Sequence, residues 1–236
     1  MASIRSTSLV PDAKRQSPPP LVSGDRLTRD EFERRYRGMP DVKKAELIEG
    51  VVYMPSPVRY GSHGKPHSTL NAWLVYYAAK TSAMLGYADN ATVRLDNDNE
   101  PQPDLFLLLP AHLGGKAKID EDDYISGPPA LVCEIAASSV SIDTHLKKTA
   151  YRRNGVQEYL VFRIEDSAID WFSLVAGDFV QIAPDSDGTL RSRIFPGLWL
   201  YPASVFAADL PAVFALLDRS TSLPEHAEFV RRLAAK

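Results

Sequence analysis

The strongest constraint on the fold is the segment "PALVCEIAA" at residues 129–137, which is apolar along nearly its whole length. A strand that covers a core with one face alternates apolar and polar residues, whereas a continuous apolar run is typical of a central strand covered on both faces. We therefore expect a sheet with helices on its two sides. Glu134 interrupts the run, and a glutamate in such a strand is seldom buried unless it is paired.

A second carboxylate stands at the start of another apolar run. In "NEPQPDLFLLL", Asp104 follows Pro103 and precedes five apolar residues. Desolvating an unpaired carboxylate costs several kcal/mol or shifts its pKa, so such residues are usually paired, hydrogen-bonded or bound to a metal. Taken alone, Asp104 could equally cap a turn after Pro103, because aspartate favours turns.

Length and composition favour one domain. The 236 residues are enough for a sizeable core, and neither an internal repeat nor a second domain boundary is evident. Residues 1–25 are rich in Ser, Pro and charged residues, which predicts a disordered lead-in. We expect a single domain over residues 26–236. Apolar residues make up 44% of the chain and charged residues 24%, as in ordinary globular proteins.

Charge and cysteine content limit the classes of partner and compartment. The net charge of −3 does not indicate nucleic-acid binding, although it is compatible with a local basic groove. Cys133 is the one cysteine, so no disulfide can form within the chain, and the cytoplasm is the simplest location. No apolar run approaches the roughly 20 residues that cross a bilayer, so we expect no membrane contact.

Helical patterns occur in four places. Thr28 and Glu31 predict a capping box that opens a helix over "RDEFERRY". Apolar spacing predicts an amphipathic helix over about 66–80, with Pro66 in its first turn. A helix of roughly three turns follows "SSVSID" and ends at Gly155. The tail from Ser204 has helical apolar spacing as well.

Strand patterns lie between the helices. "AELIEGVVYMPSP" predicts strand structure with Glu49-Gly50 as a turn or bulge. "ATVRL" and "DLFLLL" are expected to form a hairpin, followed by a long loop over residues 111–127. The final strands are "QEYLVFRI", "AIDWFSLV", "DFVQIA" and "TLRSRIF", and the last three of them predict an antiparallel meander.

Asp104, Glu134 and Lys147 stand out together, because the two acids lie on neighbouring elements and could converge at one end of the sheet. Two converging carboxylates repel each other unless a cation lies between them, and hard oxygen ligands suit Mg²⁺ or Mn²⁺. Such an ion would polarise a phosphodiester and neutralise developing negative charge, while a nearby ammonium would orient water or stabilise the phosphate. Asp143, Lys147 and Tyr151 are spaced by four and share one helix face, with Leu146 and Ala150 on an adjacent apolar face.

Four motifs together resemble one known family. "PQPDLFLL", "ALVCEIAASS", "SIDTHLKKTAY" and "NGVQEYLVF" are similar to the Uma-type restriction endonuclease family of the PD-(D/E)XK nuclease superfamily. "AELIEGVVYMPSP" and "SHGKPHSTLNAWL" also match its pattern. The resemblance covers roughly residues 45–174, with a weaker match through "FPGLWL".

The resemblance implies an α/β fold of restriction-endonuclease type, with a mixed central sheet flanked by helices and an antiparallel extension. It also implies a metal-dependent endonuclease that acts on nucleic acid, with DNA as the expected substrate. Asp104 and Glu134 take the acidic positions, and both would hold Mg²⁺ or Mn²⁺. The superfamily lysine would fall at Ala136, and Lys147 on the following helix holds that role in the Uma-type pattern.

Several other residues are candidates for accessory roles at this site. Glu46 and Glu49 could supply an extra acidic ligand, and Gln102 a nearby hydrogen bond. We expect His63 near the entrance to the site and His67 packed on the core, because Pro66 separates them and no third zinc ligand is evident. Tyr151 is expected between helix and sheet, with contact to the site as the lesser alternative.

Two other interpretations remain open at this point. The chain could be a catalytically inactive protein of this fold that binds nucleic acid or another protein, which the displaced lysine and the lack of basic composition favour. It could also be a structural dimer in which buried acids are merely paired, for instance Glu134 with Lys147. The extra strands and the C-terminal helix offer surfaces for a homodimer, but nothing in the sequence establishes one.

Overall fold

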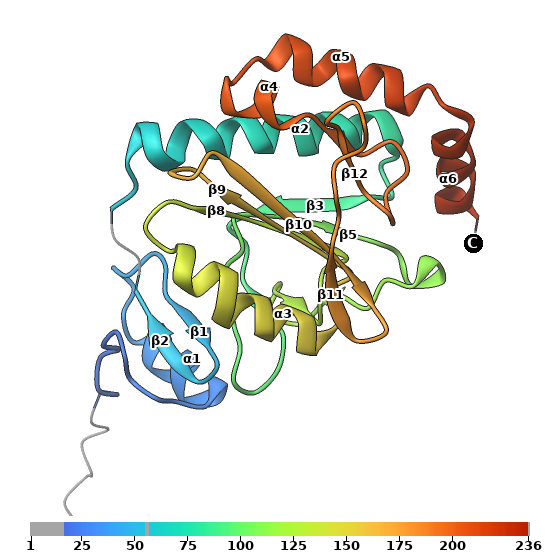
Figure 1. The fold of residues 1–236 in the computed structure, drawn as a ribbon. Helices are drawn as coiled ribbons and strands as arrows, with labels where there is room; N and C mark the ends of the chain where they lie inside the picture. The colour runs from blue at the N-terminus through green and yellow to red at the C-terminus, as the bar shows by residue number, and fades with distance from the viewer. Residues whose placement is uncertain (1–16, 55–56, 236) are drawn as a thin grey trace, which may run out of the picture.

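A six-stranded mixed sheet lies at the centre of the computed structural model, which describes residues 17–54 and 57–235 (Figure 1). β8 and β9 pair in parallel, and every other neighbouring pair in this sheet is antiparallel. The α/β class with a mixed sheet is therefore confirmed. In spatial order the strands are β11 (Asp178–Gln181), β10 (Ala168–Val175), β9 (Glu158–Arg163), β8 (Leu131–Ala136), β5 (Leu105–Leu108) and β3 (Gly86–Asp89).

β8 is buried along its whole length, as its apolar run predicted. Its side chains alternate between two cores, because Cys133 packs in the larger cluster and Val132 in the smaller one on the other face. The larger core lies under α2 (Lys65–Thr81), with α4 (Pro202–Phe206) and α5 (Leu210–Thr221) stacked beyond it (Figure 1). The smaller core lies under α3 (Lys148–Asn154), which contributes Tyr151.

The N-terminal part forms its own small layer below the sheet in Figure 1. It contains α1 (Arg29–Arg37) and a hairpin of β1 (Glu46–Ile48) with β2 (Val51–Tyr53). Glu49 and Gly50 have φ of 51° and 72°, so the predicted turn is present. The predicted capping box is wrong, because Thr28 makes no side-chain cap and Glu31 instead accepts hydrogen bonds from arginines one turn further along α1.

Part of the expected N-terminal lead-in, residues 1–16, lies outside the described residues. Residues 17–25 are described, and Leu21 is buried against the cluster that contains Phe32. The packed part of the chain therefore begins before residue 26. The reason is the burial of one side chain, Leu21, which composition averaged over 25 residues does not distinguish.

The predicted hairpin of "ATVRL" with "DLFLLL" is wrong. β4 (Val93–Arg94) instead joins a small sheet with β7 (Ile125–Ser126) and β6 (Lys118–Ile119), formed from the segment that the sequence predicted as a loop. β5 pairs with β3, and the backbone N–H of Asn90 donates to the Pro103 carbonyl, which brings the chain back to the sheet. The polar turn itself is present, because the Leu95 N–H donates to the Asn99 carbonyl and the Val93 N–H to the Pro101 carbonyl, but this pairing ends before β5 begins.

The antiparallel extension is present, but its meander starts and ends one strand earlier in the chain than predicted. β9, β10 and β11 form the meander, whereas the segment "TLRSRIF" contains β12 (Leu190–Arg191), which pairs with β13 (Trp199–Leu200). The chain then ends in α4, α5 and α6 (Pro224–Ala234), as the apolar spacing of the tail indicated. Within residues 17–54 and 57–235, no helix combines the length and apolar character that a bilayer crossing requires.

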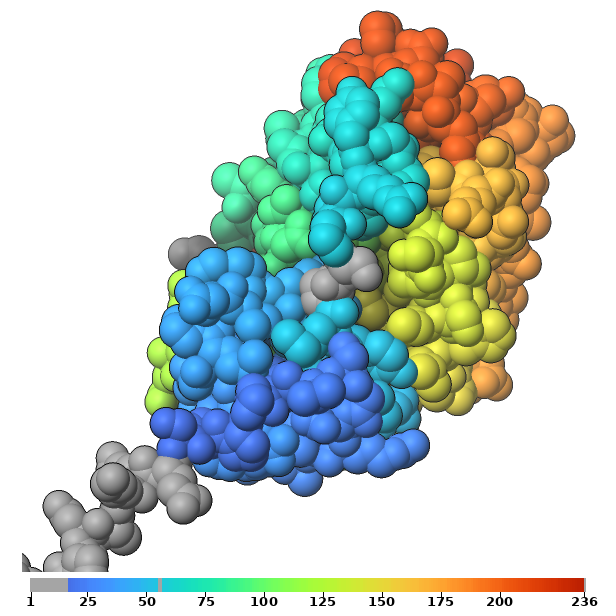
Figure 2. Space-filling model, turned by 90° about the vertical axis from the view of Figure 1, so that its left-hand side faces the viewer, coloured from blue at the N-terminus to red at the C-terminus, as the bar shows by residue number. Residues whose placement is uncertain are grey.

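Three segments that are far apart in sequence meet on one face of the molecule. Figure 2 shows the N-terminal layer in blue, the start of α2 in cyan and the chain after β8 in yellow-green beside one another. Two wide helical turns lie at this junction: η1 (Tyr60–Gly64) leads into α2, and η3 (Ile142–Lys147) leads into α3. Such π-type turns often occur at functional sites.

Candidate active site

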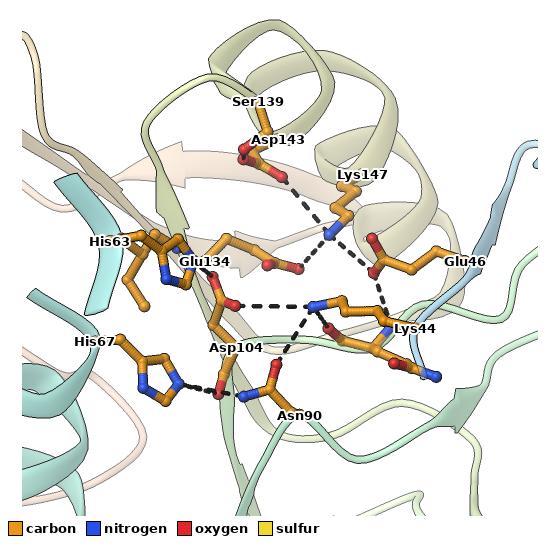
Figure 3. Close-up of polar contacts among 12 residues, drawn as sticks. Lys44, Glu46, His63, His67, Asn90, Asp104, Glu134, Ser139, Asp143 and Lys147 are labelled. Carbon is orange, nitrogen blue, oxygen red and sulfur yellow. Dashed lines mark hydrogen bonds and ion pairs between the residues drawn. The ribbon is translucent and has the colours of Figure 1, made fainter. Parts of the chain in front are cut away.

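Asp104 and Glu134 face each other across neighbouring strands. β5 and β8 are antiparallel with Leu105 opposite Cys133, so one further step of this register places Asp104 opposite Glu134. Directly opposite residues have Cβ atoms about 4.5–5.5 Å apart and project from the same face. The structure thus brings together the two acids that the sequence singled out (Figure 3).

Glu134 is buried and surrounded by other ionisable groups. Burial raises its pKa to about 8, and the Asp104, Asp143 and Glu46 carboxylates act in the same direction, against the opposing charge of Lys147. Within the described residues its two hydrogen bonds come from Lys147 and Tyr151, and both end on Oε1. This carboxyl group therefore holds a proton more tightly than an ordinary glutamate does.

Lys147 reaches the site from the end of η3. Its Nζ lies 3.0 Å from Glu46 Oε1, 3.1 Å from Glu134 Oε1 and 3.7 Å from Asp143 Oδ1. Burial by itself would lower the pKa of Lys147, but the three carboxylates outweigh burial and raise that pKa well above its ordinary value. The amine is therefore charged, and it balances the acids around it.

Asp143, Lys147 and Tyr151 lie on one helix face, as their spacing of four predicted. Asp143 and Lys147 are in contact, and one turn later the Tyr151 hydroxyl donates to Glu134 Oε1 over 2.7 Å. Tyr151 is both packed between helix and sheet and in contact with the site, so the two alternatives for it hold together. Leu146 differs from the expectation of an apolar face, because 38% of it is exposed where η3 turns toward solvent.

Asp104 is held as a carboxylate by its neighbours. Although burial alone would raise its pKa, a hydrogen bond from His63, the charge of Lys44 and the backbone N–H of Ile135 together lower it. Asp104 Oδ2 lies 3.5 Å from His63 Nε2 and accepts from the Ile135 N–H over 2.8 Å. Asp104 Oδ1 lies 3.9 Å from Lys44 Nζ. The carboxylate therefore points toward a backbone donor of β8 and toward the His63 and Lys44 side chains.

The two histidines lie closer together than predicted. His63 is in η1 and His67 in α2, and their rings stack with centroids 5.8 Å apart. His63 contacts Asp104, whereas His67 is only half-buried and its Nε2 lies 3.2 Å from the Asp104 carbonyl oxygen. The expectation that His67 packs on the core is wrong, because the helical path begins at Tyr60 and carries both rings to the same edge.

Of the two candidate accessory acids, Glu46 lies at the site and Glu49 lies outside it. Glu46 contacts Lys147, and its Oε1 also accepts from the Gln102 backbone N–H over 2.8 Å. The Gln102 side chain points elsewhere, toward Thr92. Glu49 lies in the β1–β2 turn, where its carboxylate accepts from Arg153 and Asn99. Its described contacts thus place it in a different cluster from Asp104 and Glu134.

Three further residues at the site had no role in the sequence-based prediction. Lys44 lies beside Asp104, and Asn90 accepts a hydrogen bond from the Lys44 amine. The signal for Lys44 was its position two residues before Glu46, because residues i and i+2 of an extended segment project from the same face. Asp143 was placed on the Lys147 face without a role, and the structure adds it to the acids around that amine.

The site has the chemistry that a divalent cation requires. Asp104 and Glu134 offer hard oxygen donors, and burial together with the nearby carboxylates makes a bare charge on Glu134 unfavourable, which a bound cation would relieve. Among the residues that the structure describes, no group of three or more His, Cys, Asp or Glu lies close enough to hold an ion. Two carboxylates fit Mg²⁺ nonetheless, since it usually keeps several waters and is often bound through one or two carboxylates.

Comparisons with known proteins agree with this architecture. The Uma2 family model, described as "Putative restriction endonuclease", matches residues 29–204. A solved structure described as "a putative nuclease belonging to DUF820", from Anabaena variabilis, aligns with a TM-score of 0.55 and 14% sequence identity. The alignment covers 77% of this chain and 98% of that one, and it bears on the fold alone. No curated protein matches the chain.

Proposed function

The chain belongs to the Uma2 family of restriction-endonuclease-like proteins, and we propose that it is a divalent-metal-dependent endonuclease that hydrolyses phosphodiester bonds, with DNA as its substrate. The observation that carries the proposal is the meeting of Asp104 and Glu134 across β5 and β8, with the Lys147 amine 3.1 Å from Glu134. Each of the three residues comes from a separate element, so their meeting is a property of the fold.

Asp104 and Glu134 would hold the cation through their carboxylate oxygens. When bound, Mg²⁺ or Mn²⁺ would supply Lewis-acid polarisation of the phosphodiester and neutralise the charge that develops on it. The Ile135 N–H fixes the direction of the Asp104 carboxylate, and the Tyr151 hydroxyl does the same for Glu134. These contacts keep the acids in one arrangement before substrate arrives, which lowers the reorganisation that catalysis needs.

Lys147 would act on the water side of the reaction. Its ammonium group has three donors, and the three carboxylates around it hold it in place. From that position it would bridge Glu46 and Glu134, and the donor that faces the more distant Asp143 would orient a water. Hydrolysis would form a bond from this water oxygen to phosphorus and break one phosphorus–oxygen ester bond. A carboxylate would accept the proton that the water loses, and the leaving oxygen would take a proton from solvent water.

A cleavage assay with purified protein tests the proposal. Supercoiled DNA should be nicked or cut with Mn²⁺ or Mg²⁺ and remain intact with a chelator. Asp104→Ala and Glu134→Gln should lower the rate by at least about a hundredfold, because each removes a group that stabilises the transition state. Glu228→Gln, on the exposed surface of α6, is the matched control and should cut like the wild type. Circular dichroism checks that the variants fold.

Two outcomes would count against the proposal. Equal residual cutting by the wild type, Asp104→Ala and Glu134→Gln would identify a contaminating nuclease. Absence of both cutting and Mn²⁺ binding, the latter measured by calorimetry, would favour the inactive binding protein instead. A parallel assay with single-stranded RNA shows whether DNA is the preferred substrate.

A further inference from the structure

The site contains two lysines with different surroundings, and only one of them is open to a substrate. The Lys147 side chain is 7% exposed, whereas that of Lys44 is 26% exposed. They approach the acids from different directions, Lys147 from η3 and Lys44 from the segment that precedes β1 (Figure 3). This difference in exposure separates the roles that the two amines can take.

The Lys147 amine is occupied by contacts with carboxylates of the protein itself. Its amine has three carboxylate neighbours within 3.7 Å, and these neighbours are themselves buried. To contact a phosphate, the amine would have to leave carboxylates that would then be buried without a partner, which costs several kcal/mol. A phosphodiester that enters the site therefore does not find its counter-charge on Lys147.

Lys44 has the opposite arrangement. Its amine donates to the Gln102 carbonyl oxygen over 3.1 Å and to Asn90 Oδ1 over 3.3 Å, and both of these acceptors are neutral. Asp104 is the one carboxylate among its described contacts, and at 3.9 Å it lies beyond hydrogen-bonding distance. Neutral acceptors hold the ammonium group in place without cancelling its charge.

The local fold keeps this amine beside the acids. Lys44 precedes β1, and the main chain of that strand is tied to the segment before β5 by two hydrogen bonds between Leu47 and Glu100. Asn90 is fixed in turn, because its N–H donates to the Pro103 carbonyl oxygen next to Asp104. The position of Lys44 relative to Asp104 is thus set by backbone contacts and does not depend on the side chain alone.

We propose that Lys44 is the cation that contacts the scissile phosphodiester, while Lys147 holds the carboxylates and the water. The inference rests on the proposed nuclease function and assigns the phosphate side of that site. Lys44 would neutralise a phosphate oxygen next to Asp104, where negative charge increases during hydrolysis. It would also add one counter-charge to the binding of the nucleic acid.

The test compares Lys44→Gln with Lys43→Gln. Lys43 is the matched control, because it is the adjacent residue, is exposed and donates to the Pro40 carbonyl oxygen. Both variants lose one positive charge from the same segment. The first measurement is the cleavage rate at saturating DNA with Mn²⁺, and Lys44→Gln should lower kcat by about a hundredfold while Lys43→Gln leaves it unchanged.

The second measurement does not depend on activity. The affinity for a fluorescein-labelled DNA duplex is measured in chelator over a series of salt concentrations. Loss of one phosphate contact should reduce the slope of log K against log salt by about 0.9 in Lys44→Gln, and Lys43→Gln should keep the wild-type slope. A lysine that only supports the fold would not change this slope.

Further variants keep the test decisive if Lys44→Gln does not fold. Lys44→Met retains most of the aliphatic stem, and thermal unfolding together with Mn²⁺ binding shows whether the site is intact. Lys44→Arg restores the charge and should restore the salt slope, with kcat recovered in part. Wild-type cutting together with equal kcat and equal slopes in the Lys44 and Lys43 variants would overturn the role of Lys44 and leave the nuclease function standing. A wild type that neither binds nor cuts DNA would overturn both.

Discussion

Glu158 is a buried carboxyl outside the candidate site, and it fastens a distant loop to the central sheet. It lies in β9 and accepts hydrogen bonds from the Trp171 indole, the Ser192 hydroxyl and the Arg193 backbone N–H. Burial raises its pKa to about 7 from the ordinary 4.5, although these three donors favour the charged form. Desolvation is therefore the larger effect at this residue.

The raised pKa makes the stability of the protein depend on pH. Between about pH 4.5 and 7 the folded protein keeps a proton on Glu158 that the unfolded chain has released. The contribution of this proton to folding is complete below about pH 4.5 and is lost as the pH rises through 7. We expect Glu158→Gln to remove this dependence, so that the wild type loses about 3 kcal/mol relative to the variant across the interval.

Urea denaturation at a series of pH values measures the difference in unfolding free energy between the two proteins. Any effect of the amide that is independent of pH displaces the curve without altering its slope. Glu165→Gln, at an exposed position after β9, is the control for removal of a charge and should run parallel to the wild type. If the Glu158→Gln curve is also parallel to the wild type, Glu158 does not titrate in this range.

At the level of elements, the hairpin between β10 and β11 contains a residue that fits its backbone poorly. Val175 pairs with Asp178, so Ala176 and Gly177 form a two-residue turn with φ of 51° and 90°. Turns of this kind require positive φ at both central positions and favour Asn-Gly. An alanine in the left-handed region costs about 1–2 kcal/mol.

Substitutions in this turn should shift stability in opposite directions. Ala176→Asn should raise the unfolding free energy by about 0.5–1 kcal/mol, because asparagine tolerates the left-handed region better. Gly177→Ala should lower it by about 1 kcal/mol, and no atom lies within 4 Å of the added Cβ, so the effect arises from the backbone. Urea denaturation at one pH measures both, and shifts of the same sign would contradict the assignment of the turn.

Elements differed in how well local sequence specified them. α2 and β8 were predictable, because an amphipathic or a fully apolar pattern records which faces are buried. The partner of β5 was not, since the apolar "DLFLLL" accepts any neighbour that covers it, and the chain supplied β3. The cap of α1 failed because two arginines compete for Glu31, and that competition depends on rotamers rather than on spacing.

At the scale of the whole molecule, Arg94 links parts of the chain that are distant in sequence. Its guanidinium donates to Asp120 and Asp122 over 2.8 Å each and to Glu33 in α1 over 2.9 Å, and it lies 4.5 Å from the Tyr124 ring. The segment over residues 111–127, which the sequence predicted as a long loop, is thus tied to the N-terminal layer. A network of charged hydrogen bonds and a cation–π contact of this kind fixes the segment over residues 111–127 to the rest of the fold.

Loss of the Arg94 contacts should increase local opening of residues 116–124 without unfolding the whole protein. We expect Arg94→Met to raise the rate of limited proteolysis within residues 116–124 by at least about tenfold, because hydrogen bonds to charged groups contribute roughly 1.5–3 kcal/mol. Mass spectrometry locates the cleavage sites. Arg153→Met is the control, because Arg153 also bridges two acids but is 45% exposed. Equal cleavage in the two variants would show that Arg94 does not secure this segment.

Local patterns in the chain determined that a buried central strand carries Glu134, that Asp104 opens a second buried strand and that Lys147 follows on a helix. Periodicity encodes burial, and a charge within an apolar run has to be neutralised somewhere, so these positions were identifiable without coordinates. Tertiary structure alone decided that Glu46 joins Asp143 at Lys147, that Lys44 lies beside Asp104 and that Glu49 belongs to another cluster. The physical reason is that strand pairing and helix docking join residues far apart in the sequence, up to 104 positions for Glu49 and Arg153. Such pairings are selected by packing of the whole chain, which no local pattern records.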